Sequence, residues 1–288
     1  MEISDLQVFK QVADSGGITH AAKVLNRVPS NITARIQKLE EELEKPLFIR
    51  EKNRLYISSA GQELLNYANQ ILTLANQAKQ SLQGTQPSGT LRIGYMDAVA
   101  ATRVVRPLKY FHEAYPEVTL HVNSAPTGLL IEQVIASDLD LALVADPEAD
   151  SRLCIEPIFE EELVVVSCSQ HGVIHHPRDL QNNPTVLGFN HKCAYRNRLT
   201  RWLAHGQCIA KVIEINSYHA MLSCVAAGMG IAMVPRALLN DYPFIDSIQC
   251  HTLPKAWSHS TTALIWRKDY ESPAMSAFKA QLKPLVSF

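Results

Sequence analysis

The sequence lacks the long apolar runs that a membrane-spanning chain needs. Stretches such as LTLANQA and GIAMVP are short and have polar edges, so none approaches the length of a bilayer-crossing helix. The opening residues, MEISDLQVFKQ, contain neither the basic segment nor the apolar stretch of a secretion signal. We therefore expect a cytoplasmic protein without a membrane partner.

The sequence also has little that indicates redox, metal or catalytic chemistry. Its six cysteines are scattered and form no C-x-x-C pair, which is typical of reduced thiols. The His-rich stretch CSQHGVIHH has no second ligand cluster at a zinc spacing, and no nucleophile–base–orienter set stands out. We expect no catalytic residue, no metal and no cofactor, and an enzyme acting on a small substrate is the disfavoured alternative.

An excess of positive charge is absent too, because the formal net charge is -1. This excludes binding of nucleic acid through overall charge, so any such surface must be local. What the chain does have is length and apolar content. Its 288 residues, 47% of them hydrophobic, are enough for two or three domains with separate cores.

The first sixty residues have helical spacing followed by a hairpin. Apolar residues recur at helical spacing up to Gly16, and HAAKVLN, with Thr19 as its N-cap, forms a second short helix. Pro29 suits the first turn of a third helix that runs to about Glu44. The segment PLFIREKNRLYISSAG then changes period about Asn53, which predicts a small hairpin. This order matches a winged helix-turn-helix.

The third helix has a polar outer face. Ile32, Ile36, Leu39 and Leu43 form its buried stripe, which leaves short polar and basic side chains outside. Such side chains suit base edges in the major groove, and basic residues of the hairpin suit the neighbouring phosphates. The predicted DNA-binding residues are Arg27, Ser30, Asn31, Thr33, Ala34, Arg35, Lys38, Arg50, Lys52 and Arg54.

A heptad pattern follows the hairpin from Ser59 to about Gln83. Its a/d positions are Leu64, Ala68, Ile71, Ala75, Ala78 and Leu82. A single helix of this length favours pairing with a second subunit, and the alternative is a helix that packs on its own domain. GTQPSG, at Gly84–Gly89, is typical of a linker.

Beyond Gly89 the chain alternates strands such as TLRIGY, VTLHVNS and TVLGF with helical segments. This alternation predicts an open, largely parallel α/β sheet whose length allows two subdomains. Ligands of such sheets bind at the carboxyl ends of the strands.

Together these segments resemble the LysR-type transcriptional regulators. In that family a helix with paired alanines precedes Gln-Pro-Ser, an Ile-x-x-Leu-Glu helix, Leu-Phe-x-Arg, and a Thr-x-x-Gly exit from the wing. The corresponding residues here are Ala21-Ala22, Val28-Pro29-Ser30, Ile36 to Glu40, Leu47 to Arg50, and Ser58 to Gly61. The resemblance is very specific over residues 1–65 and continues more loosely through VAAGMGIAMVP. Val28 and Asn31 depart from the family pattern, so the family's operator preference does not carry over.

The resemblance implies a sequence-specific DNA-binding regulator of transcription that a small effector controls. It implies a winged helix-turn-helix over residues 1–58, a dimerising linker helix and hinge over 59–88, and an effector domain over 89–288 similar to periplasmic binding proteins. Within the last, one subdomain would comprise about 89–161 and 267–288, and the other about 162–266. The chain would cross between them near Glu160–Glu162 and Ile265–Lys268. Partners would be a double-stranded DNA operator with dyad symmetry, further copies of the chain in a dimer and tetramer, and RNA polymerase.

Strand ends indicate where the effector would bind, between the two subdomains. The predicted effector-binding residues are Asp97, Ala98, Val99, Thr127, Gly128, Asp146, Asn190, Tyr195, Ser217, Tyr218 and His219. Carboxylates beside aromatic rings favour a cationic amine such as a diamine or polyamine. Alternatively, Asp97 or Asp146 could cap a helix or pair with Arg103 or Arg196.

Two other modes of regulation stay open. An organic anion could bind Thr127, Ser217 and helix N-termini, with Arg196 as the cation. Oxidation of Cys193 and Cys208 is the other, because His191, Lys192 and Arg196 surround Cys193 in the sequence and could lower its thiol pKa.

Overall fold

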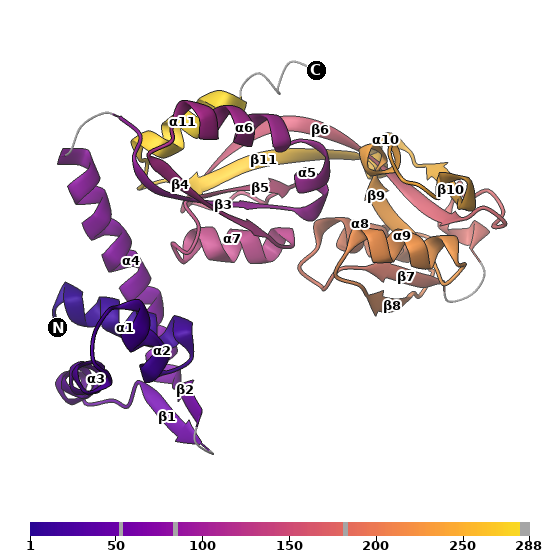
Figure 1. Cartoon of the computed structure of the whole chain (residues 1–288). Coiled ribbons are helices and arrows are strands. Elements are labelled where there is room, and N and C mark those ends of the chain that lie inside the picture. The colour runs from indigo at the N-terminus through magenta and orange to yellow at the C-terminus, as the bar shows by residue number, and fades with distance from the viewer. Residues whose placement is uncertain (52–53, 83–85, 181–183, 283–288) are drawn as a thin grey trace. The chain divides into compact units, whose positions relative to one another are not determined.

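The structure is a computed structural model that describes residues 1–51, 54–82, 86–180 and 184–282. The chain divides into two compact units, one mainly before residue 86 and the other after it (Figure 1). Each unit is described by itself. Of the predicted linker, Gly84 and Thr85 lie outside the described residues, as does Lys52 of the predicted DNA-binding set.

The first unit consists of three short helices, a hairpin and a long fourth helix. Its elements are α1 (Ile3–Ser15), α2 (Ile18–Val24), α3 (Pro29–Leu43), β1 (Phe48–Glu51), β2 (Arg54–Ile57) and α4 (Ser59–Leu82). α1 ends at Gly16, whose left-handed backbone (φ 66°) suits glycine. The predicted helices and hairpin are confirmed. The predicted cap of α2 is wrong: Thr19 lies inside the helix, which begins earlier, with Gly17 as its cap.

The apolar stripes of these helices share one core. Phe9 of α1 and Ile32 and Leu39 of α3 are among its most buried side chains. Ala68 of α4 is fully buried against the same core, so the first half of α4 packs on its own domain. Two other apolar side chains of α4 stay exposed: Tyr67 is 57% and Leu74 is 66% exposed.

The second unit is an α/β domain. Its strands are β3 (Gly89–Tyr95), β4 (Val118–Ser124), β5 (Leu141–Ala145), β6 (Leu153–Cys168), β7 (Thr185–Gly188), β8 (Lys211–Glu214), β9 (Ala232–Pro235), β10 (Ile248–Thr252) and β11 (His259–Arg267). Its α-helices are α5 (Asp97–Thr102), α6 (Val105–Ala114), α7 (Thr127–Ile135), α8 (Ala194–His205), α9 (Tyr218–Ala226), α10 (Lys255–Ser258) and α11 (Pro273–Leu282). Its 3₁₀ turns are η1 (Pro177–Asp179), η2 (Arg236–Leu239) and η3 (Ile245–Ser247).

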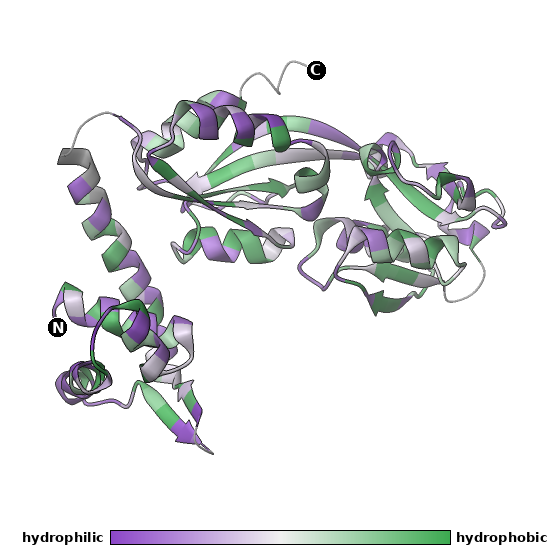
Figure 2. Ribbon diagram, in the orientation of Figure 1, coloured by the Kyte–Doolittle hydropathy of each residue, from purple (hydrophilic) through white to green (hydrophobic). Residues whose placement is uncertain are grey.

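Two subdomains share the long strand β6. In the first, β4, β3, β5 and β11 lie side by side, with α6 and α11 on one face and α7 on the other (Figure 1). In the second, the end of β6 pairs with β9 and β10, and the pair β7–β8 joins through the bridge between Val186 and Ile231. The buried strands β5 and β9 are apolar, whereas hydrophilic residues occur on other strands, including β6 and β10, as well as on the helices (Figure 2).

The sheet differs from the prediction in its strand directions. β3 is parallel to β4 and β5, but β6, β9, β10 and β11 pair antiparallel, so the sheet is mixed rather than largely parallel. β11 already pairs with β5 from Thr262, so this part of β11 belongs to the first subdomain, whereas the sequence placed the return near Ile265. The pattern of one strand does not reveal its partners, because pairing joins segments far apart in the chain.

Candidate functional site

The turn between α2 and α3 begins the candidate DNA-binding surface. Asn26 has a left-handed backbone (φ 51°), and the N–H of Arg27 donates to the carbonyl of Ala22 at 2.9 Å. Pro29 follows at the first position of α3, where a missing N–H removes no helical hydrogen bond. The turn thus presents one face of α3 to solvent while Ile32 and its neighbours enter the core.

Most of the predicted reading face of α3 is on the solvent side. Its exposed members are Ser30, Asn31, Ala34 and Lys38. Thr33 is half-buried and donates its hydroxyl to the carbonyl of Pro29 at 3.0 Å. Arg27 is exposed, and its guanidinium donates to the side-chain oxygen of Asn31 at 3.3 Å. A basic and an amide side chain therefore form one polar group at the start of the helix.

Arg35 differs from the rest of this face because its guanidinium is already bound within the domain. It donates to Asp5 Oδ1 at 2.6 Å and to Ser4 Oγ at 2.9 Å, both on α1. Asp5 is 2% exposed, and Lys38 Nζ lies 3.6 Å from its Oδ2. Arg35 thus joins α3 to α1, and a base contact would compete with this ion pair.

The wing formed by β1 and β2 carries exposed Arg50 and Arg54. Its base is held by Glu40 of α3, whose carboxylate accepts the N–H of Leu47 at 2.7 Å and that of Phe48 at 3.2 Å. In the sequence, Glu40 stands only as the last residue of the family's Ile-x-x-Leu-Glu motif. In the structure this carboxylate positions the wing.

A cavity of about 410 Å³ lies between the two subdomains of the second unit. Its walls follow the carboxyl ends of β3, β4, β7 and β8 and include the first residues of α7, α8 and α9. The lining residues are Met96, Asp97, Ser124, Ala125, Pro126, Thr127, Phe189, Asn190, Cys193, Ala194, Tyr195, Asn216 and Tyr218. This is the place that the strand-end rule for open α/β sheets indicates.

The cavity brings together part of the predicted effector set. The predicted residues that line it are Asp97, Thr127, Asn190, Tyr195 and Tyr218. Those outside its lining are Ala98, Val99, Gly128, Asp146, Ser217 and His219. Ala98 and Val99 are buried in the core, whereas His219 lines a second cavity of about 480 Å³. Local sequence does not reveal which side chain of a strand end faces inward.

Sequence reasoning missed several lining residues. They are Met96, Ser124, Ala125, Pro126, Phe189, Cys193, Ala194 and Asn216. Most are immediate neighbours of predicted residues in the chain. A prediction that included every residue around each strand end would therefore have contained them.

Asp97 is a carboxylate of the cavity that stays without a partner in the described part of the chain. It forms no hydrogen bond or ion pair with the residues that the structure describes. The pairings considered from the sequence do not form, because Arg103 binds Glu161 (3.3 Å) and Arg196 binds Glu214 (2.8 Å). Nor does Asp97 cap α5, whose N-cap is Met96. The described lining contains no lysine, arginine or histidine.

Asp146, in contrast, has hydrogen-bond partners for both of its carboxylate oxygens. Its Oδ2 accepts from the Arg198 guanidinium at 2.5 Å and from the Ser260 hydroxyl at 2.8 Å, and its Oδ1 accepts from the N–H of Thr261 at 2.9 Å. Its backbone is left-handed (φ 44°), which is uncommon for a residue other than glycine. Because Asp146 follows β5 and Arg198 lies on α8, this ion pair connects the two subdomains.

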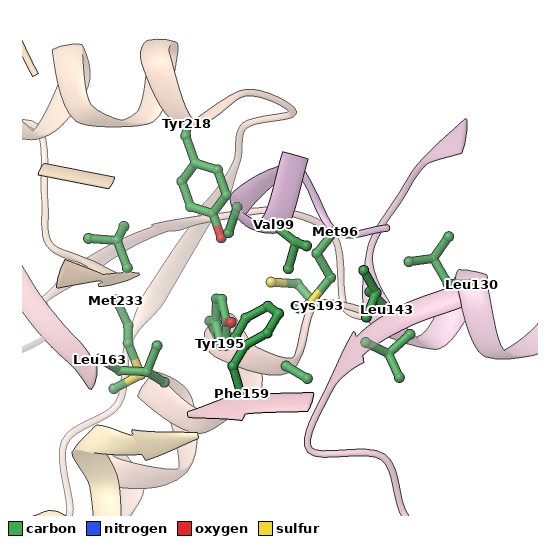
Figure 3. Packing of buried hydrophobic residues seen from close by; sticks show 14 of the residues in the cluster. Met96, Val99, Leu130, Leu143, Phe159, Leu163, Cys193, Tyr195, Tyr218 and Met233 are labelled. Atoms are coloured by element: carbon green, nitrogen blue, oxygen red, sulfur yellow. The ribbon is translucent and has the colours of Figure 1, made fainter. Parts of the chain in front are cut away.

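Two tyrosines and a cysteine of the cavity lining lie close to one another. Figure 3 shows the Tyr218 hydroxyl directed toward Cys193 and Tyr195. Burial raises the pKa of both phenols, and the nearby charges of Glu161 and Asp146 raise that of Tyr195 further. Both hydroxyls are therefore protonated at neutral pH and can donate hydrogen bonds.

The cysteines are not arranged for the redox alternative. Burial raises the pKa of the Cys193 thiol, which reduces the reactive thiolate. Cys193 precedes α8 and Cys208 follows it, so a helix of 12 residues, about 18 Å long, separates them. A disulfide between them would require backbone movement.

A metal-ion site and a membrane-spanning helix are both absent from the described residues. No group of three histidine, cysteine or acidic side chains there could hold a metal ion. No helix of this part of the chain is long and apolar enough to cross a membrane.

Comparison with known proteins covers both units. The family model of the LysR substrate binding domain matches residues 84–286, and that of the bacterial regulatory helix-turn-helix protein, lysR family, matches residues 3–62. The HTH-type transcriptional regulator CzcR of Bacillus anthracis is 34% identical over 281 residues, which cover 96% of each chain. The regulator GltR of Bacillus subtilis is 34% identical over 286 residues, 98% of this chain and 96% of its own.

Solved structures share the fold. A full-length OxyR variant from Pseudomonas aeruginosa aligns with a TM-score of 0.74 at 18% identity, over 99% of this chain and 94% of that one. CbnR in complex with its target DNA aligns with a TM-score of 0.67 at 21% identity, over 99% of this chain and 100% of that one. The relatives are named as transcriptional regulators, in agreement with the expectation that the chain is not an enzyme. The chain therefore belongs to the LysR family of transcriptional regulators, with a helix-turn-helix DNA-binding domain followed by an effector-binding domain.

Proposed function

We propose that this regulator is controlled by an effector that carries an ammonium group, such as a diamine or polyamine, bound in the 410 Å³ cavity. The observation that carries the proposal is Asp97, a carboxylate of the cavity lining that no described cation neutralises. A carboxylate in such a site favours a positively charged hydrogen-bond donor. The rival organic anion lacks its predicted cation, because Arg196 is bound to Glu214 and to the carbonyl of Phe189.

Effector binding would act on DNA through closure of the cavity. The Asp146–Arg198 ion pair and the bond from the Gly128 N–H to the Lys192 carbonyl (3.0 Å) already join the two subdomains. An effector that favours one closure shifts the balance of conformations by its difference in affinity for them.

The operator is proposed to be double-stranded DNA with dyad symmetry, bound in the cytoplasm by a dimer that assembles into a tetramer. Tyr67 and Leu74 support the dimer, because they lie one heptad apart on α4 and are exposed in the single chain. CbnR, a structural neighbour, was solved with its target DNA. Arg27 and Asn31 would read bases at the start of α3, and RNA polymerase would be a further partner.

We expect Arg54→Ala to weaken binding to operator and unrelated DNA by the same factor. Arg54 is exposed on the wing and would neutralise a phosphate, so the slope of log affinity against log salt should flatten by about 0.9. Fluorescence anisotropy over a salt series measures both quantities. Lys109→Ala, which removes an exposed charge of α6, is the matched control and should change neither. A loss confined to operator DNA would contradict the phosphate role.

A thermal-shift series on the full chain tests the effector. We expect 1,4-diaminobutane or spermidine to raise the melting temperature of the effector domain, because binding to the folded state stabilises it, and succinate to leave it unchanged. Asp97→Asn should abolish the shift with amines. If no amine raises the melting temperature while succinate does, the ammonium proposal fails.

A further inference from the structure

The outer side of α3 lies opposite the helix's buried residues, which are Ile32, Ile36 and Leu39. Successive residues of an α-helix are about 100° apart around its axis, so residues i, i+4, i+7 and i+11 fall close to one line. The line opposite the buried residues contains four exposed ones: Ser30, Ala34, Gln37 and Glu41. Arg35 stands nearer the buried side, in agreement with its ion pair to Asp5 on α1. A duplex that lies against α3 would therefore meet Gln37 rather than Arg35.

Gln37 has the longest uncharged side chain on this outer line. Those of Ser30 and Ala34 are short, and the carboxylate of Glu41 is repelled by phosphates. The amide of Gln37 carries both an acceptor oxygen and a donor nitrogen. Neither atom has a hydrogen-bond partner among the residues that the structure describes. The amide is therefore available to a ligand, whereas the guanidinium of Arg35 is bound to Asp5.

A groove beside Gln37 indicates where a DNA strand would pass. It has a volume of about 270 Å³ and lies between α3 and the wing. Gln37 and Thr33 line it on the helix, and Arg50 lines it on the wing. The exposed guanidinium of Arg50 suits a phosphate, and phosphate contacts fix the register of a protein on the duplex. A strand held by Arg50 would thus pass close to Gln37.

The charges around Gln37 favour a base over a phosphate as its ligand. Glu40 and Glu41 follow it by three and four residues, so both are its neighbours on the helix surface, and Glu40 lines the same groove. Two carboxylates near one amide repel a phosphate. An adenine edge carries no charge and presents an amino donor at N6 and an acceptor at N7. A glutamine amide matches this pair of groups with two hydrogen bonds.

We propose that Gln37 is a specificity-determining residue that reads an adenine in the major groove; this inference rests on the proposed double-stranded operator. The side-chain oxygen accepts from adenine N6 and the side-chain nitrogen donates to N7, while Arg50 holds a phosphate of the neighbouring backbone. Gln37 lies more than one helical turn beyond Asn31, so it reads a different base pair from the residues at the start of α3.

Sequence selection by the full chain from a random double-stranded DNA library tests the inference. We expect the unmodified chain to select an adenine at one position of each half-site, and Gln37→Ala to show no preference there. Gln37→Ala should also weaken binding to the selected operator about tenfold, because a bidentate base contact is lost, and leave affinity for unrelated DNA unchanged. Gln37→Glu should select cytosine at the same position, because a carboxylate accepts from cytosine N4. A purely structural role of Gln37 would not change the selected base.

Gln7→Ala is the matched control, because Gln7 is an exposed glutamine on α1, and it should select the same sequence as the unmodified chain. If Gln37→Ala also selects that sequence, the inference fails and the proposed operator stands. An equal loss of affinity for operator and unrelated DNA would assign Gln37 to a phosphate and overturn the inference as well. If the unmodified chain selects no sequence, the proposed operator and this inference both fail, and membership of the LysR family is untouched.

Discussion

Replacing Arg35 with alanine is expected to lower the free energy of unfolding of the DNA-binding domain by about 3 kcal/mol. The guanidinium is 2.6 Å from Asp5, whose side chain is 2% exposed. Without it a carboxylate stays buried, with Lys38 Nζ at 3.6 Å as its remaining cation. Affinity for operator and for unrelated DNA should then fall together, because α3 loses its attachment to α1. Hydrogen exchange of α1 and α3 in the full chain measures the change.

Two further variants separate this structural role from base reading. Arg27→Ala removes an exposed arginine of the same surface and should change the free energy of unfolding by less than about 0.5 kcal/mol. The double variant Asp5→Leu, Arg35→Met removes both charges and should recover most of the lost stability. Unchanged hydrogen exchange in Arg35→Ala, together with a loss confined to operator DNA, would instead support the base contact predicted from the sequence.

Acidification is expected to destabilise the effector domain through His251 on β10. This histidine is 2% exposed, its Nδ1 accepts the N–H of Ile174 at 3.0 Å, and its Nε2 lies 2.7 Å from Ser167 Oγ. The backbone donor requires a neutral ring with the proton on Nε2. Burial, and then the charges of His171 and His175, lower its pKa from 6.5 to about 4.

The direction of this pH dependence follows from the state, folded or unfolded, that binds the proton more tightly. Below pH 6.5 this histidine becomes protonated in the unfolded chain. In the folded domain it stays neutral until the pH falls to about 4. The contribution of neutral His251 to the free energy of unfolding is therefore fully present above pH 6.5 and is lost as the pH falls to about 4. The pKa difference corresponds to at most about 3 kcal/mol, and we expect about 2 kcal/mol because solvent screens the charge of exposed His175.

Urea unfolding at pH 7 and pH 5.5 measures this effect before most carboxylates titrate. We expect the unmodified protein to lose about 1 kcal/mol over that interval. His251→Gln, which keeps an acceptor for Ile174 but does not titrate, should lose much less. His112→Gln on α6 changes an exposed histidine and should behave as the unmodified protein does. Equal pH dependence in all three proteins would refute the role of His251.

The features that sequence predicted correctly are local. The stripe of α3, the hairpin and the strand ends around the cavity depend on helical pitch and strand alternation, which act within a few residues. Asp97 and Tyr218 line the cavity, as the strand-end rule predicts, because each lies within four residues of the end of a strand, β3 or β8.

The features that sequence missed depend on contacts between distant segments. Arg35 stands on the outer side of its own helix, and only the packing of α1 brings Asp5 to it. Asp97 and Asp146 occupy similar strand exits, yet α8 carries Arg198 to Asp146, whereas no cation among the described residues reaches Asp97.

Residue spacing along the chain is enough to predict the family, the order of the elements and the polar face of α3. Which charges are paired and which face the cavity depends on tertiary contacts, because these contacts join residues that lie far apart in the chain.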